Sequence, residues 1–216
     1  MQQKGCKPSA ITYTIIMHAL GKAKQMKEAL DVYDKMKESG CAPDAPFYSS
    51  LLFALGKSGR LKDAWEVFED MQGQGVAREL LTYNTMISLS CAHLQEESAL
   101  KLLQRMEEDS CKPDVETYAP LLKMCCRKKR MKVLKFLLGH MSKNDVSIDL
   151  GTYSLLIRGL CKSGKLEHAC SFFEESILKG MVPRDGIYKM LVEELQLKNM
   201  AEAKKKIEEL MSLAKE

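Results

Sequence analysis

The sequence lacks the features that mark a membrane protein, a multidomain chain with linkers, or a strongly basic protein. It contains no run of about 18 or more apolar residues, so we expect no membrane partner. Six prolines and 13 dispersed glycines leave no flexible linker. The excess of positive charge is small, with 33 Lys and Arg against 29 Asp and Glu. Bulk charge alone therefore does not predict nucleic-acid binding.

Residue patterns for catalysis and metal binding are also missing. The four histidines are scattered, and there is neither a Gly-rich phosphate loop nor a Gly-x-Ser-x-Gly elbow. The eight cysteines include no Cys-x-x-Cys pair and no Cys/His cluster at metal-ligand spacing. We therefore expect no enzyme, no metal site and no cofactor.

The cysteines recur instead at a fixed step, which predicts a packing role. Members of two groups are separated by 35 residues or a multiple of 35: Cys6, Cys41 and Cys111 in one group, and Cys91, Cys126 and Cys161 in the other. Residues one repeat apart occupy equivalent places in neighbouring units. We expect these cysteines to be small buried hydrophobic residues of a protein from a reducing compartment.

A period of 35 residues runs through the whole sequence. Six of the seven tyrosines follow one another at this step: Tyr13, Tyr48, Tyr83, Tyr118, Tyr153 and Tyr188. Four methionines do the same: Met36, Met71, Met106 and Met141. Repetition of several residue types at one period predicts a stacked array of supersecondary units.

Each repeat contains two helical patterns. In the first repeat, an apolar stripe predicts a first helix: Ile15, Ile16, Ala19 and Leu20. Helical spacing then predicts a second helix: Met26, Ala29, Leu30, Tyr33 and Met36. Glycines close the second helices, at Gly40, Gly75 and Gly180. Because such a helix pair cannot bury its apolar faces alone, we predict an all-α, right-handed superhelical solenoid of helix–turn–helix repeats.

The repeat boundaries follow from the period. We place five repeats at 10–44, 45–79, 80–114, 115–149 and 150–184. Residues 185–216 are expected to form a C-terminal helix pair, a partial repeat that serves as a cap. Residues 1–9 align with residues 36–44 and are interpreted as the end of an upstream repeat. The chain is therefore expected to be a fragment of a longer array.

These repeats resemble the pentatricopeptide repeat family, in the class built only from 35-residue units. The resemblance covers residues 1 to about 210. It rests on Ile-Thr-Tyr-Thr-Ile-Ile at 11–16, Leu-Thr-Tyr-Asn-Thr-Met-Ile at 81–87 and Thr-Tyr-Ser-Leu-Leu-Ile-Arg-Gly-Leu-Cys-Lys-Ser-Gly-Lys-Leu at 152–166. It implies single-stranded RNA binding in a mitochondrion or chloroplast, with about one base per repeat, in transcript processing, stability or translation.

The resemblance also implies which residues read bases. The reading pair consists of the residue after the tyrosine and the last residue of the repeat. These pairs are Thr14 with Asp44, Ser49 with Glu79, Asn84 with Asp114, Ala119 with Asp149, and Ser154 with Arg184. The first pair resembles a guanine reader and the third a uracil reader. Ala119 has no hydrogen-bonding group and Arg184 replaces an acceptor with a donor, so no base is assigned there. The alternative is that the polar residues simply begin helices in contact with solvent.

Two further positions complete the implied RNA site. Two residues before the tyrosine, Ile11 and Leu81 offer an apolar face for a base. The equivalent positions hold Pro46, Glu116, Gly151 and Gly186, which fit this role poorly. Nine residues after the tyrosine, phosphate contacts are implied at Lys22, Lys57, Arg127 and Lys162, whereas the third repeat has Ala92. A basic residue at a helix C-terminus also has a purely structural explanation, because it complements the helix dipole.

A second function remains open from the sequence. The poor reading and stacking positions of the second, fourth and fifth repeats are typical of a scaffold that keeps its packing residues while its groove residues vary. The partners would then be other organellar RNA-processing or ribosomal proteins.

Overall fold

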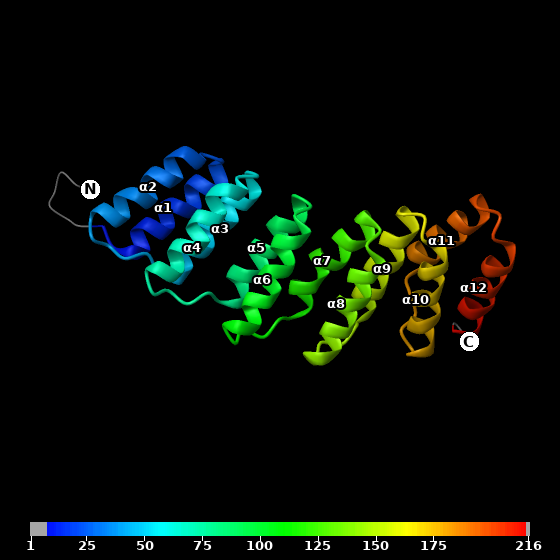
Figure 1. Ribbon diagram of the computed structural model, residues 1–216. Helices are drawn as coiled ribbons and strands as arrows, with labels where there is room; N and C mark the ends of the chain where they lie inside the picture. Colours follow the sequence, from blue (N-terminus) through cyan, green and yellow to red (C-terminus); the bar gives the residue numbers. More distant parts are fainter. Residues whose placement is uncertain (1–7, 215–216) are drawn as a thin grey trace. The chain divides into compact units, whose positions relative to one another are not determined.

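The structure is a computed structural model that describes residues 8–214. Within this range the chain forms twelve helices and no strands (Figure 1). Their bounds are α1 Ala10–Ala23, α2 Met26–Glu38, α3 Ala45–Lys57, α4 Leu61–Gly73, α5 Leu80–Ala92, α6 Glu96–Glu108, α7 Val115–Lys128, α8 Met131–Lys143, α9 Leu150–Lys162, α10 Leu166–Leu178, α11 Asp185–Leu197 and α12 Ala201–Leu213. None of the described helices is long and apolar enough to cross a membrane. Cys6 and most of the predicted segment 1–9 lie outside the described residues.

The helices form successive hairpins in two compact units, residues 1–112 and residues 113–216. In the first unit α1 packs on α3, and α3 on α5. In the second unit α7 packs on α9, and α9 on α11. Within each unit, therefore, the odd-numbered helices lie side by side in one layer, and each even-numbered helix pairs with the odd helix before it (Figure 1).

Small residues set the close approach of neighbouring odd helices. A Cβ atom added to Gly21 of α1 would lie 2.9 Å from the Ala54 Cβ atom of α3. A Cβ atom added to Gly159 of α9 would lie 2.8 Å from the Cys126 Cβ atom of α7. Both distances are shorter than real side chains tolerate, so each contact needs a residue without a side chain.

Five of the periodic tyrosines hold an odd helix to the even helix that follows it: Tyr13, Tyr48, Tyr83, Tyr118 and Tyr153. Their rings are buried, and each hydroxyl bonds a polar side chain from the end of that even helix or its cap. Tyr188 of α11 is only partly buried. The Tyr48 hydroxyl donates to Asp70 Oδ2 at 2.8 Å and the Tyr153 hydroxyl to Glu175 Oε1 at 2.8 Å. The Tyr118 hydroxyl lies 2.7 Å from His140 Nδ1. These bonds satisfy the hydroxyl groups that burial removes from water and fix the rotation of α1, α3, α5, α7 and α9.

The glycines that close the even helices behave as predicted. Gly40, Gly75 and Gly180 have φ values of +71°, +69° and +73°. This left-handed conformation, which favours glycine, lets the next N–H group return to the helix. After α2, the Cys41 N–H donates to the Met36 carbonyl at 3.1 Å.

The structure corrects two packing predictions. Ile15 and Ile16 were predicted to form the apolar stripe of the first helix, but they are 65% and 40% exposed, and α1 buries Tyr13 and Met17 instead. Among the cysteines, Cys91, Cys126 and Cys161 are buried as predicted, and burial raises the pKa of the last two to about 11 and about 12. Cys41 and Cys111 are only partly buried, because they lie where the chain leaves an even helix.

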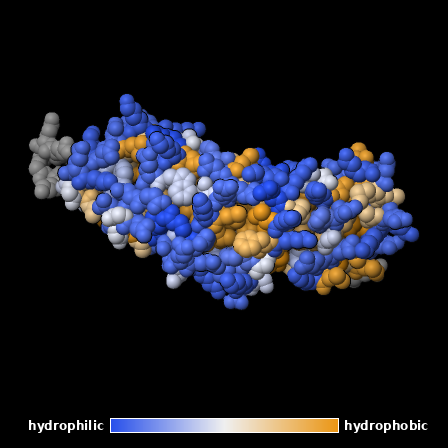
Figure 2. Space-filling model, viewed as in Figure 1, coloured by the Kyte–Doolittle hydropathy of each residue, from blue (hydrophilic) through white to orange (hydrophobic). Residues whose placement is uncertain are grey.

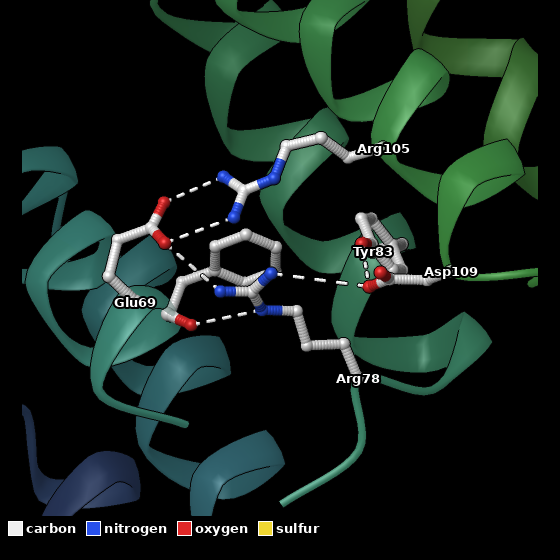
Figure 3. Close-up of polar contacts among 6 residues, drawn as sticks. Glu69, Arg78, Tyr83, Arg105 and Asp109 are labelled. Carbon is white, nitrogen blue, oxygen red and sulfur yellow. Dashed lines mark hydrogen bonds and ion pairs between the residues drawn. The ribbon is translucent and has the colours of Figure 1, made fainter. Parts of the chain in front are cut away.

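A charged cluster joins the second and third hairpins of the first unit (Figure 3). The buried Arg78 guanidinium donates to Glu69 Oε2 at 3.0 Å and to the Phe68 carbonyl at 3.2 Å. Arg105 binds the same Glu69 carboxylate with two nitrogens, at 2.6 and 3.0 Å. Hydrogen bonds from Arg105 hold the pKa of Glu69 below its usual range. The cluster therefore stabilises the position of α6 against α4.

The same cluster extends to the tyrosine of the third hairpin. The Tyr83 hydroxyl donates to Asp109 Oδ2 at 2.5 Å, and that oxygen lies 4.0 Å from Arg78 Nη1 (Figure 3). Arg78 occupies the position at which other repeats have a buried proline, Pro43 or Pro113. The face of the molecule in Figure 2 is mostly hydrophilic, as expected if the apolar side chains lie between the helices.

Candidate nucleic-acid interface

Each odd helix exposes one stripe of five positions, counted from its periodic tyrosine at −2, +1, +2, +5 and +9. On α1 the stripe consists of Ile11, Thr14, Ile15, His18 and Lys22, none of which is buried. Helical periodicity places residues three, four, seven and eleven apart on one side of a helix, away from Tyr13. We call these residues the odd-helix stripe. All the implied RNA-contacting residues except the last residue of each repeat belong to it.

The residues implied to read bases all have a similar, intermediate exposure to solvent. Thr14, Ser49, Asn84, Ala119 and Ser154 are all partly exposed, and each follows a tyrosine fixed in the core. The Thr14 hydroxyl donates to the Ala10 carbonyl at 2.9 Å, and the Ser154 hydroxyl to the Leu150 carbonyl at 2.8 Å. While these bonds hold, each hydroxyl meets a ligand as an acceptor, because its one hydrogen is already donated.

The last residues of the repeats have a structural role that was not predicted. Asp44, Asp114 and Asp149 are N-cap residues of α3, α7 and α9, and accept backbone N–H groups at 2.9, 2.8 and 2.7 Å. Hydrogen bonds from Thr152 keep the pKa of Asp149 below its usual range. Glu79 and Arg184 occupy the same position without a side-chain cap bond. Capping holds each of the three aspartates at the start of an odd helix, whatever else it binds.

The stacking positions differ between repeats as the sequence indicates. Ile11 and Leu81 are 70% and 62% exposed, so their apolar surfaces are available to a ligand. Phe53 on α3 adds an apolar surface that was not predicted: it is 54% exposed, and the Lys57 ammonium lies 4.5 Å from its ring centroid. Phe53 and His18 both occupy the +5 position, so a comparison of this position across the repeats would have identified Phe53.

The implied phosphate-binding residues are all exposed. Lys22 and Lys57 lie in the last turns of α1 and α3, and Arg127 and Lys162 in the last turns of α7 and α9. Each side chain can therefore reach an anion beside the stripe while its charge complements the helix C-terminus.

In the second unit, the stripes of α7 and α9 line an open groove of about 800 Å³. The groove includes three residues implied by the resemblance, Arg127, Ser154 and Lys162. It also includes three further cations, Lys123, Lys129 and Arg158. The remaining lining residues are Gly151, Leu155, Gly159 and Ser163. The lining contains no carboxylate, so the groove carries positive charge only.

Within residues 8–214 no group of three or more His, Cys, Asp or Glu side chains is arranged to hold a metal ion. The interface described above therefore consists of hydrogen-bonding, apolar and cationic groups. Such a set suits the binding of a base edge, a base face and a phosphate.

Comparison with known proteins decides the family. The family model described as the pentacotripeptide-repeat region of PRORP (PPR_long) matches residues 1–184. The chain belongs to the pentatricopeptide repeat family. A mitochondrial pentatricopeptide repeat-containing protein of Arabidopsis thaliana is 67% identical to it over 49 residues, which is 23% of this chain and 9% of the relative.

Pentatricopeptide repeat proteins of known structure share the fold. The maize protein PPR10 matches 96% of this chain with a TM-score of 0.82 and 22% identity, and PPR10 in complex with an 18-nt psaJ RNA element matches 97% with a TM-score of 0.72. The PPR domain of Arabidopsis thaliana protein-only RNase P 1, in complex with tRNA, matches 83% with a TM-score of 0.70 and 18% identity. These likenesses confirm the predicted fold class, an all-α superhelix of helical repeats.

The chain is short compared with several of these proteins. The match to the mitochondrial relative spans 9% of that protein's length and the match to PPR10 spans 30%, whereas the match to the RNase P repeat domain spans 95%.

Proposed function

We propose that this chain binds single-stranded RNA sequence-selectively, with the odd-helix stripes of each unit as its RNA-binding surface. The observation that carries this proposal is the repeated order of groups along a stripe. On α1, α3 and α9 a polar side chain beside a core-anchored tyrosine is followed eight residues later by an exposed cation: Thr14 and Lys22, Ser49 and Lys57, and Ser154 and Lys162. On α1 the exposed Ile11 precedes them. A base edge, a phosphate and a base face can be bound by polar, cationic and apolar groups of these kinds.

We assign one nucleotide to each of the repeats 10–44, 45–79, 80–114, 115–149 and 150–184, with 185–216 as a terminal cap. In the first unit, Thr14 with Asp44 reads guanine and Asn84 reads uracil; Asp114, which the resemblance pairs with Asn84, belongs to the second unit. Ile11 and Leu81 stack on these bases, and Lys22 and Lys57 hold phosphates. Ser49 with Glu79, Asp149 and Ser154 occupy the same positions without an assigned base. Arg127 and Lys162 bind phosphates in the second unit.

The cellular role follows from the relatives. The resemblance to PPR10 and to a repeat domain that is bound to tRNA supports RNA as the ligand. The relative that is 67% identical over 49 residues is mitochondrial, which favours a mitochondrion over a chloroplast. The chain would act there in transcript processing, stability or translation, as a binding module without catalytic residues of its own.

The test is fluorescence anisotropy with labelled single-stranded RNA pools at two salt concentrations. The test variant is Lys22/Lys57/Arg127/Lys162→Ala. The control replaces four exposed lysines of even helices, Lys27, Lys101, Lys132 and Lys135, with Ala. Four phosphate contacts give a log–log salt slope of about −3, since each contributes about 0.7 for a single strand. We expect the test variant to lose this salt-dependent binding and the control to keep it.

Two results would contradict the proposal. Equal losses in the test and control variants would show that the stripes do not contact RNA. Absence of RNA binding by the unaltered chain would favour the scaffold function, with organellar RNA-processing or ribosomal proteins as partners.

A further inference from the structure

The groove between α7 and α9 is chemically unlike the stripes of the first unit. Cations occupy both the +5 and the +9 positions of its two helices, as Lys123 and Arg127 on α7, and Arg158 and Lys162 on α9. In the first unit the +5 positions hold His18, Phe53 and Ser88. Each of these two helices therefore carries two stripe cations, whereas each odd helix of the first unit carries at most one.

These cations have no partner that would explain them. Within residues 8–214, Lys123, Arg127, Lys129, Arg158 and Lys162 form no ion pair, and no carboxylate lines the groove. Some cations elsewhere on the surface are paired, such as Lys179 with Glu175 at 2.7 Å and Lys206 with Glu174 at 2.7 Å. Unpaired cations that converge on one groove point to an anionic ligand from outside the chain.

Two cations on the same face of α7, and two on α9, lower the stability of the folded chain rather than raise it. Like charges at i and i+4 on one helix repel, by roughly 0.2–0.5 kcal/mol for an exposed pair. The helix dipole offsets this repulsion only near the C-terminus, and therefore only for the +9 residues Arg127 and Lys162. Lys123 and Arg158 lie earlier in their helices, so the fold itself gives no reason for their charge.

The same groove is poor at recognising bases. Gly151 stands at the stacking position of α9 and has no side chain to cover a base. Ala119 stands at the reading position of α7 and has no hydrogen-bonding group. The absence of a side chain at Gly151 leaves the groove open, which admits a backbone but does not orient a base.

We propose that the α7/α9 groove is a base-independent anchor that binds the phosphodiester backbone of a single strand. The guanidinium groups of Arg127 and Arg158 can donate two parallel hydrogen bonds to a phosphate, and the lysines supply point charges beside them. Leu155, half-buried in the lining, can contact the sugar. This anchor rests on the proposed function, but it assigns base selectivity to the first unit and base-independent affinity to the second.

The test uses a short labelled single strand in which every nucleotide is an abasic site, beside an RNA of the same length. The test variant is Lys123→Ala/Arg158→Ala, which leaves the four implied phosphate-binding residues in place. The matched control is Lys132→Ala/Lys135→Ala, which removes the same charge from exposed positions of α8. Circular dichroism melting curves of both variants establish that they remain folded.

We expect the unaltered chain to bind the abasic strand. The test variant should lower the log–log salt slope by about 1.4, at about 0.7 per lost phosphate contact, and the control should leave it unchanged. Neither variant should alter base preference in RNA pools, because neither residue pair reads a base.

Other outcomes separate the anchor from the function on which it rests. Binding of RNA without binding of the abasic strand overturns the anchor and leaves the RNA function standing. A third result would support the anchor and overturn sequence-selective reading. In this case the abasic strand binds, only the test variant loses this binding, and the RNA pools show no base preference. Equal weakening by the test and control variants overturns the anchor, and failure to bind either strand overturns both proposals.

Discussion

The two units use the same helical framework but present different chemistry. In the first unit the odd-helix stripes carry exposed apolar side chains, Ile11, Phe53 and Leu81, and few cations. In the second unit the stripes of α7 and α9 carry two cations each, and these four cations line the same groove as Gly151. The buried side of the helices hardly changes between them, because Tyr83 and Tyr153 are both fully buried and both donate to a carboxylate.

This contrast shows how a repeat framework separates folding from binding. The stripe contributes little to packing, so its residues can change from apolar to cationic without moving the helix that carries them. The tyrosine, the small contact residues and the caps must stay, because each satisfies a buried group or a close approach. A single architecture can therefore combine stacking in one unit with electrostatic attraction in the other.

The units also differ in how a hairpin is held to the next. Arg78 and its partners join α4 to α6 in the first unit, whereas Pro183 stands at the equivalent position in the second. We expect Arg78→Ala to lower the free energy of unfolding by about 2 kcal/mol, because it removes a buried guanidinium from Glu69 and from the Phe68 carbonyl. The half-exposed Glu69 keeps Arg105, which limits the loss.

Urea unfolding, monitored by tryptophan fluorescence, measures this change in the unit that contains Arg78. The single tryptophan, Trp65, lies on α4 with its ring centroid 5.7 Å from that of Phe68. The control is Arg60→Ala, which removes a more exposed arginine paired with Asp63 at 2.7 Å and should cost less than about 1 kcal/mol. A loss for Arg78→Ala no larger than for Arg60→Ala would mean that the cluster is not a source of stability.

The difference in base recognition between the two units predicts a smaller change in free energy than Arg78→Ala does. Asn84→Ala should lower affinity for uracil at one ligand position by about 1 kcal/mol, roughly fivefold, because one hydrogen bond to a base edge is lost. Ser154→Ala should leave base preference unchanged at every position, since the neighbouring Gly151 and Ala119 cannot orient a base. Anisotropy titrations against RNAs that vary one position at a time provide the measurement. Equal effects of the two substitutions would remove the distinction between a reading unit and an anchoring unit.

The smallest effect concerns the turns inside the hairpins. Leu94, between α5 and α6, has a φ of +58°, whereas the equivalent residue between α9 and α10 is Gly164. Leu94→Gly should raise the free energy of unfolding by up to about 1 kcal/mol, because it relieves a left-handed conformation that costs an ordinary residue about this much. The control Leu94→Ala removes the side chain but keeps the strain. Urea unfolding followed by Trp65 fluorescence should show stabilisation by Gly and none by Ala.

Most of the framework could be predicted from the sequence. The 35-residue step of the tyrosines identified the repeat, and the spacing from Met26 to Met36 identified an even helix that buries Met26, Ala29, Tyr33 and Met36 as predicted and Leu30 only in part. The glycines that close even helices were also predicted correctly, because a left-handed φ is a local requirement of the chain. These features depend on residues close together in sequence or on equivalent positions one period apart.

The candidate site could be predicted only in part. The resemblance indicated Arg127, Ser154 and Lys162, which the structure brings into one groove, but not Lys123 and Arg158 beside them. It assigned Asp44 and Asp114 to base reading, and the structure shows that both also cap helices. A capping bond involves only nearby residues, so the aspartates directly before α3, α7 and α9 could have indicated it.

The sequence by itself determined the period, the helix pairs and the residues that share a helix face, because 3.6 residues per turn and a repeated pattern are local properties. Only the tertiary structure decided which of those faces stays open. Ile16 is apolar and was expected to be buried like Leu51, its equivalent on α3. Leu51 is buried and Ile16 is not, because α3 packs against odd helices on both sides, whereas among the described helices of its unit α1 meets only one. Burial depends on neighbours distant in sequence, and the cationic groove likewise exists only because α7 and α9 lie side by side.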